Sequence, residues 1–149
     1  EGVVHSGDLI SAGRHVGIQF PFMRNLVAMC ELMLSWDAAV YIPGHGPLLT
    51  AADVRDILDY LHFMTGEARR RYDAGMPAQA ATDDILANLG AYASLKGAEN
   101  LFFTVRMLYC EFAGDTEDHV RRNYPEYLAT QWKLRRTVPE KFPSLFARF

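Results

Sequence analysis

The 149-residue sequence contains little cysteine and no long uninterrupted apolar run. Cys30 and Cys110 each stand inside an apolar helical pattern and not in a close pair, which predicts buried free thiols in place of a disulfide or a metal knuckle. The most apolar stretch, residues 20–36, is interrupted by Arg24 and Glu31, so no segment is expected to span a bilayer. We therefore expect a soluble protein, with a cytoplasmic location favoured and no membrane partner.

A strong charge of one sign is also lacking. The formal net charge is -3 and the pI is about 5.9, so no global electrostatic feature points to nucleic acid as a partner. Half of the residues are hydrophobic, which argues against disorder and allows one domain with a sizeable core. The first residue is Glu1 and no signal-peptide pattern precedes Val3. This start suggests processing, proteolysis or the choice of expressed region.

Two short runs are typical of strands. Residues 3–6 lead into a turn at Gly7 and Asp8, and residues 39–42 stop at Pro43. An apolar stripe over residues 21–36 indicates a helix between them. The order strand, helix, strand predicts a βαβ unit with parallel strands. Because two strands alone are marginally stable, we expect the sheet to be completed by a missing N-terminal half or by a second subunit.

The rest of the chain has helical patterns. Thr50 can cap the N–H of Asp53 at the start of the clearest helix, which Gly75 and Pro77 end. Three arginines at residues 69–71 are interpreted as a solvated helix face with partners such as Glu67. Further helices are expected to start at or near Pro77 or Thr82, Leu101, Thr116 and Pro125.

Candidate metal ligands follow both predicted strands. Asp8 comes after the first, and His45 lies in the turn PGHGP after the second. Ligand sites gather at the carboxyl ends of strands in open α/β sheets, so Asp8 and His45 are expected to face one crevice. A carboxylate and an imidazole suit zinc, iron or manganese. Gly44 and Gly46 allow close approaches and unusual backbone angles in this turn.

The segments GDLIS and YIPGHGP, one helix apart, resemble the last two metal-binding motifs of the metallo-β-lactamase superfamily. The following LLTAADVRDILDYLHFM is similar to the helix after the final histidine in glyoxalase-II-like members. The resemblance covers about the first half of the chain and implies an α/β fold. Residues 1–75 would be the C-terminal part of an αββα metallo-β-lactamase-like domain with few strands. Residues 76–149 would be an α-helical C-terminal extension, similar to the dimerisation region of alkylsulfatase-like members, which suggests a homo-oligomer.

The resemblance also implies roles for the candidate residues. Asp8 would bridge two zinc ions and hold the attacking water, and His45 would complete the second ion. In such hydrolases, metal-activated water attacks an ester, thioester or amide-like bond of a small molecule. His15, in the loop near the same crevice, is a candidate substrate contact. The family's His-x-His-x-Asp-His motif is absent, so this chain alone is expected to be inactive and to hold little or no metal.

A second interpretation belongs to a different class of protein. The chain could be a helical oligomerisation or protein-interaction module in which the βαβ unit is only scaffold. A hydrolase requires Asp8 and His45 to point into one cleft. Divergence of these two side chains, together with a large apolar interface over residues 101–149, would favour the interaction module.

Overall fold

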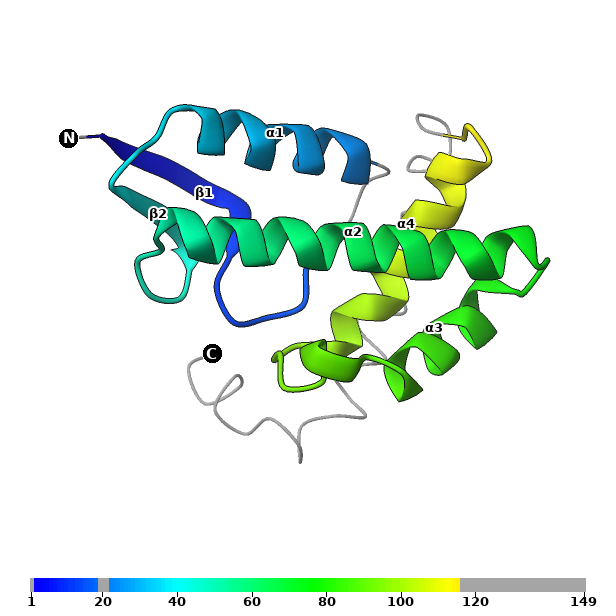
Figure 1. Ribbon diagram of the computed structural model, residues 1–149. Helices are drawn as coiled ribbons and strands as arrows, with labels where there is room; N and C mark the ends of the chain where they lie inside the picture. Colours follow the sequence, from blue (N-terminus) through cyan, green and yellow to red (C-terminus); the bar gives the residue numbers. More distant parts are fainter. Residues whose placement is uncertain (1, 19–21, 116–149) are drawn as a thin grey trace, which may run out of the picture. The chain divides into compact units, whose positions relative to one another are not determined.

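The computed structural model describes residues 2–18 and 22–115. The chain divides after Thr116, and the described residues belong to the first compact unit, Glu1–Thr116. They form a mixed α/β structure that is mostly helical (Figure 1). Its elements are β1 (Val3–Ser11), α1 (Met23–Ser35), β2 (Val40–His45), α2 (Ala51–Asp73), α3 (Ala78–Ala87), the short 3₁₀ helices η1 (Gly90–Tyr92) and η2 (Ala98–Asn100), and α4 (Leu101–Phe112).

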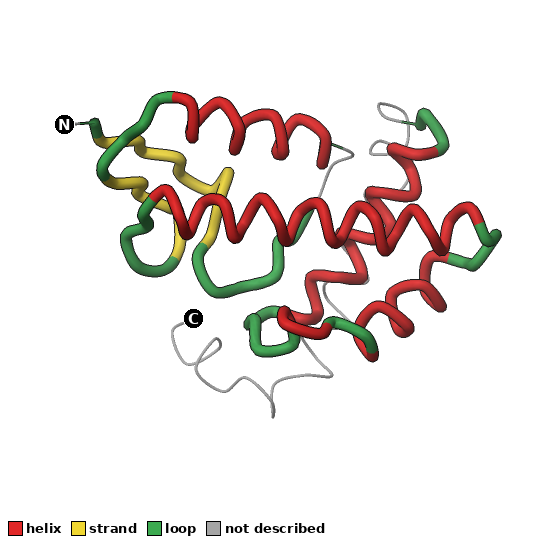
Figure 2. Tube along the Cα trace, in the orientation of Figure 1, coloured by secondary structure: helices red, strands yellow, loops and turns green. Residues whose placement is uncertain are grey.

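The predicted βαβ unit is confirmed. β1 and β2 are parallel neighbours joined through α1, with Val3 opposite Val40 and His5 opposite Ile42. The two strands lie beside the first half of α2, whereas α3 and α4 contact its later part (Figure 2). The tyrosine of β2, Tyr41, is fully buried and donates a hydrogen bond to the Met33 carbonyl of α1. One face of the sheet is therefore covered by helices.

Both strands extend beyond the turns predicted for them. β1 continues through Gly7 and Asp8, and β2 continues through Pro43. The pairing is irregular here, with register shifts on both sides of Gly7, whose φ is +54°. An extra residue at such a bulge lets the two strands remain side by side beyond the irregularity, and a bulged edge strand tolerates proline. The predicted strand ends at Gly7 and Pro43 were therefore wrong.

α2 is the central helix of the unit and contacts α1, α3 and α4. The predicted cap is confirmed: the Asp53 N–H donates to the Thr50 hydroxyl over 3.3 Å, and the Asp53 carboxylate accepts from the Thr50 N–H over 2.7 Å. Cys30 and Cys110 are buried free thiols, as predicted, and burial raises the pKa of each to about 11. The core includes Leu26, Met33, Val54, Leu61, Met64, Ala68, Ile85, Leu101, Val105 and Leu108.

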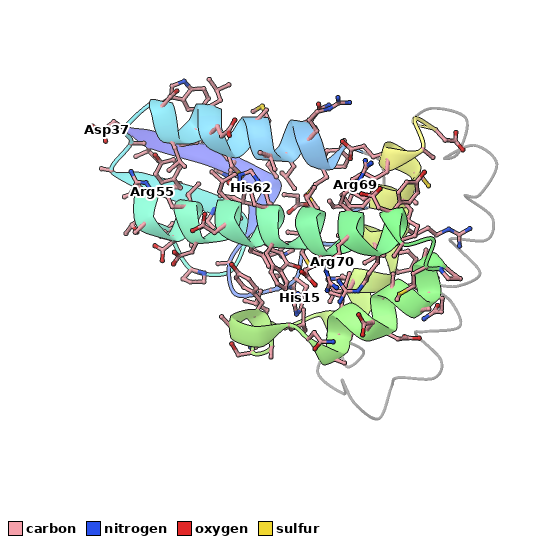
Figure 3. All side chains as sticks on the ribbon, turned by 45° about the vertical axis from the view of Figure 1, so that its right-hand side comes forward. His15, Asp37, Arg55, His62, Arg69 and Arg70 are labelled. Atoms are coloured by element: carbon pink, nitrogen blue, oxygen red, sulfur yellow. The ribbon has the colours of Figure 1, made fainter. Side chains whose placement is uncertain are left out.

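The arginines near the end of α2 differ in their surroundings. Arg69 and Arg70 are exposed and each forms an ion pair within α2, as the solvated-face interpretation expects (Figure 3). That interpretation was wrong for Arg71, whose side chain is only 2% exposed. The Arg71 guanidinium donates to the Glu67 carboxylate over 2.6 Å and to Asp84 of α3 over 2.7 Å. Arg71 thus connects α2 to α3 through an ion pair between a buried guanidinium and the half-exposed Asp84 carboxylate.

A carboxylate from α4 caps the first turn of α1. The α1 helix has no side-chain cap from its own N-cap residue. Instead, the backbone N–H groups of Met23 and Arg24 donate to the Glu111 carboxylate over 3.0 and 3.2 Å. A negative charge at this position complements the helix dipole. Two helices far apart in sequence are therefore held together by a polar contact.

The helix predictions after α2 were correct where the structure describes them. α3 starts next to Pro77, one of the two starts expected, and α4 starts at Leu101. The helices expected after Thr116 and Pro125 lie outside the described residues. The division of the chain at residue 75 stays a prediction, and α3 and α4 belong to the same compact unit as the sheet. No helix in residues 2–18 and 22–115 is long and apolar enough to cross a bilayer.

Candidate metal centre at the strand ends

The second half of β1 and the end of β2 bring Asp8 and His45 together. The Asp8 Oδ1 atom lies 3.3 Å from the His45 Nε2 atom. The backbone holds this end of the sheet in place, because Ser11 pairs with His45 and the Ala12 N–H donates to the His45 carbonyl over 2.9 Å. Both side chains are open to solvent, with 82% of Asp8 and 60% of His45 exposed. The two side chains converge on one accessible point.

This separation suits two ligands of one ion. Zinc binds histidine nitrogen and carboxylate oxygen at about 2.0–2.2 Å, and tetrahedral angles then place two ligand atoms roughly 3.3–3.5 Å apart. A carboxylate oxygen with an imidazole nitrogen also suits iron or manganese. The same distance would suit a surface ion pair, but an exposed pair contributes at most about 1 kcal/mol to folding. The donor atoms of Asp8 and His45 therefore fit part of a metal centre.

Further ligands are needed to complete such a centre. Within residues 2–18 and 22–115, no group of three or more His, Cys, Asp or Glu side chains could hold a metal ion. A structural zinc site takes four protein ligands and a catalytic one usually takes three. Two other histidines in this part of the chain, His5 and His62, are exposed on β1 and α2. Asp8 and His45 are thus at most half of a site.

The glycines of the PGHGP turn let the two chain segments approach. A Cβ added at Gly44 would lie 2.8 Å from the Asp8 backbone nitrogen and would collide with the Asp8 carboxylate. Gly46 has a φ of +97°, and a Cβ there would lie 2.7 Å from the Ala12 Cβ. Side-chain-bearing residues would therefore push the turn away from β1. The close approaches and unusual backbone angle expected from the sequence are present.

His15, the expected substrate contact, lies in the interior. Its side chain is 1% exposed, and its Nδ1 atom is 2.9 Å from the Tyr60 hydroxyl. The His15 backbone N–H donates to the Lys96 carbonyl, and the Asn100 side chain donates to the His15 carbonyl. Figure 3 shows His15 and the exposed His62 on opposite sides of α2. In this position the imidazole is not accessible from solvent, so His15 is left out of the proposed site.

Burial makes His15 a source of pH-dependent stability. Burial lowers the pKa of His15 below its ordinary 6.5, although the Glu99 carboxylate acts in the opposite direction. The folded state therefore binds this proton less readily than the unfolded state. We expect the associated stability to be complete above about pH 6.5 and to decrease as the pH falls below that value.

Urea denaturation at several pH values between about 5 and 8 measures this effect. The variant His15→Asn keeps a polar group near Tyr60 and does not titrate in this range, so its stability should fall less steeply with acidification. His62→Asn removes an exposed histidine and should behave like the parent. Equal pH dependence in His15→Asn and the parent protein would contradict the burial of a neutral imidazole.

A cavity of about 330 Å³ is lined in part by the residues that directly follow β1 and β2 in the sequence. This cavity was not predicted from the sequence. Its walls come from the loop after β1, the turn after β2, the first half of α2 and the segment from η1 to Leu95. The carboxylates of Asp53 and Asp56, three residues apart on α2, were the sequence signal that could have suggested a polar wall. Its apolar walls come from residues too distant in sequence for any pattern to connect.

Comparison with known proteins does not assign this chain to a family. No protein-family model matches this chain, and no curated protein matches it. The metallo-β-lactamase resemblance thus depends on the two motifs and the helix that follows them, and it stays a prediction.

Proposed function

We propose that this chain is the C-terminal portion of a metal-dependent hydrolase of the metallo-β-lactamase type, with Asp8 and His45 as two of its metal ligands. The observation that carries the proposal is the 3.3 Å distance between Asp8 Oδ1, in the second half of β1, and His45 Nε2, at the end of the parallel strand β2. The divergence that would favour a protein-interaction module is not seen. Two zinc ions are the proposed occupants, with iron or manganese as alternatives.

The second face of the sheet, within residues 2–18 and 22–115, is exposed at Val3, which supports the need for a second half. Val4 and Tyr41 pair on the face that includes buried Tyr41, so the neighbouring pairs Val3–Val40 and His5–Ile42 point to the other side. On that side Val3 is 65% exposed. A sheet of two strands is marginally stable by itself. An N-terminal half of the same fold, or a second subunit, would cover this face and bring the remaining metal ligands.

The chemistry of the site follows from the two side chains and the ion they would hold. A bound zinc-type ion lowers the pKa of its water towards about 7 and polarises the bond under attack. The Asp8 carboxylate has two oxygens, so one can bind metal while the other accepts a hydrogen bond that orients the attacking water. His45 would bind through Nε2 as a neutral imidazole. The proposed substrate is a small molecule with an ester, thioester or amide-like bond.

The test uses the protein expressed from its complete reading frame. Zinc content by elemental analysis and hydrolysis of a panel of ester and thioester substrates are measured for the parent protein and for Asp8→Ala and His45→Ala. We expect about two zinc ions per chain in the parent. Each variant should lose metal affinity and activity by more than roughly 100-fold, because loss of a direct metal ligand costs more than loss of a residue that only hydrogen-bonds to a ligand.

Matched controls separate ligand loss from general damage. His62→Ala and Asp83→Ala remove an exposed imidazole and an exposed carboxylate from α2 and α3. Both should retain parent zinc content and activity. A zinc content in Asp8→Ala and His45→Ala equal to that of the controls would refute the metal centre. A metal-loaded parent without hydrolase activity on any of these substrates would refute the proposed reaction.

A further inference from the structure

The cavity near the strand ends has no role in the proposed metal centre. Its volume is about 330 Å³, at the small end of the range for ligand pockets of about 300–1,000 Å³. Neither Asp8 nor His45 lines it. The residues that matter for its chemistry are Arg14, Asp56, Ile57, Tyr60, Tyr92 and Leu95. A molecule bound here would be smaller than a typical drug.

Two tyrosines form an aromatic wall that is held in place before any ligand arrives. The ring centroids of Tyr60 and Tyr92 are 5.1 Å apart in an edge-on arrangement. The buried His15 holds the Tyr60 hydroxyl at 2.9 Å, and Phe63 contacts the other tyrosine with ring centroids 4.8 Å apart. Ile57 adds an aliphatic surface from α2. A preformed apolar wall of this kind lowers the entropic cost of binding a flat apolar group.

The same cavity carries both signs of charge. Asp56 supplies an exposed carboxylate from α2, and Arg14 supplies a guanidinium from the loop after β1. Neither forms an ion pair with another side chain in the described part of the chain. Burial, and to a lesser degree the carboxylates of Asp59 and Asp56, raises the pKa of Tyr92 above its ordinary value of 10. Separate positive and negative groups beside an aromatic wall suit a molecule with both charges.

We propose that this cavity binds a small zwitterion with an apolar or aromatic body, of the class of free aromatic amino acids. The ammonium group would pair with Asp56 and the carboxylate with Arg14, while the ring lies against Tyr60 and Tyr92. A cationic amine would leave Arg14 without a partner, and an anionic acid would leave Asp56 without one. This inference does not depend on the proposed hydrolase function.

The first experiment compares three probes that share one ring. L-phenylalanine carries both charges, phenethylamine carries only the ammonium group, and 3-phenylpropionate carries only the carboxylate. Binding is followed by two-dimensional NMR of the isotope-labelled chain, in which cavity amides such as those of Ala12 and Leu95 should shift. Ligands of about twelve heavy atoms bind in the millimolar range or tighter. We expect L-phenylalanine to bind about two- to fivefold more tightly than either single-charge probe, the gain that one exposed ion pair provides.

Two variants then assign the charges. Asp56→Asn should remove the preference for L-phenylalanine over 3-phenylpropionate, and Arg14→Gln should remove its preference over phenethylamine. Asp83→Asn and Arg55→Gln are the matched controls, because both residues are exposed and outside the cavity; Arg55 is visible on α2 in Figure 3. Both controls should bind as the parent does. Thermal midpoints of all variants establish that they fold.

Three results would overturn the proposal. The first is the absence of shifts at cavity amides with millimolar L-phenylalanine. The second is equal affinity for the three probes, which would mean that the cavity recognises only the ring. The third is unchanged preference in both Asp56→Asn and Arg14→Gln. Zinc content does not enter any of these measurements, so failure here leaves the metal centre to its own test.

Discussion

Replacing Gly44 by alanine is expected to destabilise the protein by about 1–3 kcal/mol and to separate Asp8 from His45. The added methyl would lie 2.8 Å from the Asp8 nitrogen and 2.8 Å from the Gly7 carbonyl carbon. Both are backbone atoms, so the clash is relieved only by moving the end of β1 or the PGHGP turn. Urea denaturation measures the loss in unfolding free energy. Elemental analysis of the protein from its complete reading frame measures the accompanying loss of zinc.

Gly66 provides the matched control for this substitution. It lies within α2, and a Cβ added there meets nothing within 4 Å apart from its chain neighbours and the adjacent backbone of its own helix. Because alanine is a better helix former than glycine, Gly66→Ala should leave stability unchanged or raise it by roughly 0.5–1 kcal/mol. Zinc content should not change. If Gly44→Ala matched Gly66→Ala in both measurements, Asp8 and the turn would not be in close contact.

Removing the two carboxylates that surround Arg71 is the second substitution with a large expected effect. The double variant Glu67→Gln, Asp84→Asn keeps the shapes of the side chains but leaves a buried guanidinium without a counter-charge. Loss of such partners costs about 3–5 kcal/mol when the pair is fully buried. Since 26% of the Glu67 side chain and 46% of Asp84 are exposed, water replaces part of the interaction, and we expect about 3 kcal/mol.

Acid should weaken the same contact in the parent protein. Hydrogen bonds from Arg71 and then Arg70 hold the pKa of Glu67 below its ordinary 4.5. Stability from this carboxylate is therefore present above about pH 4.5 and is lost as the pH falls through the lowered pKa. The control for the double variant Glu67→Gln, Asp84→Asn is Asp73→Asn. This substitution breaks the exposed pair with Arg69 and should cost no more than about 1 kcal/mol. A double variant as stable as this control would show that Arg71 is solvated.

The sequence alone determined most local elements of this protein. The capping box at Thr50, the apolar stripes of the helices and the glycine after α4 specify structure through neighbours within a few residues. The order strand, helix, strand was also enough to predict parallel pairing, since few topologies are open to such a unit. The convergence of Asp8 and His45 followed from that topology and not from any contact visible in the sequence.

Tertiary structure decided the features that depend on partners far along the chain. Arg71 is buried because Asp84 of α3 reaches it, and His15 is buried because Tyr60 of α2 offers a hydroxyl in the interior. Glu111 caps a helix whose own residues provide no cap. The strands continue past their predicted ends because a bulge keeps them paired. Local sequence carries propensities over a few residues, whereas burial and charge pairing depend on which distant segments meet when the core forms.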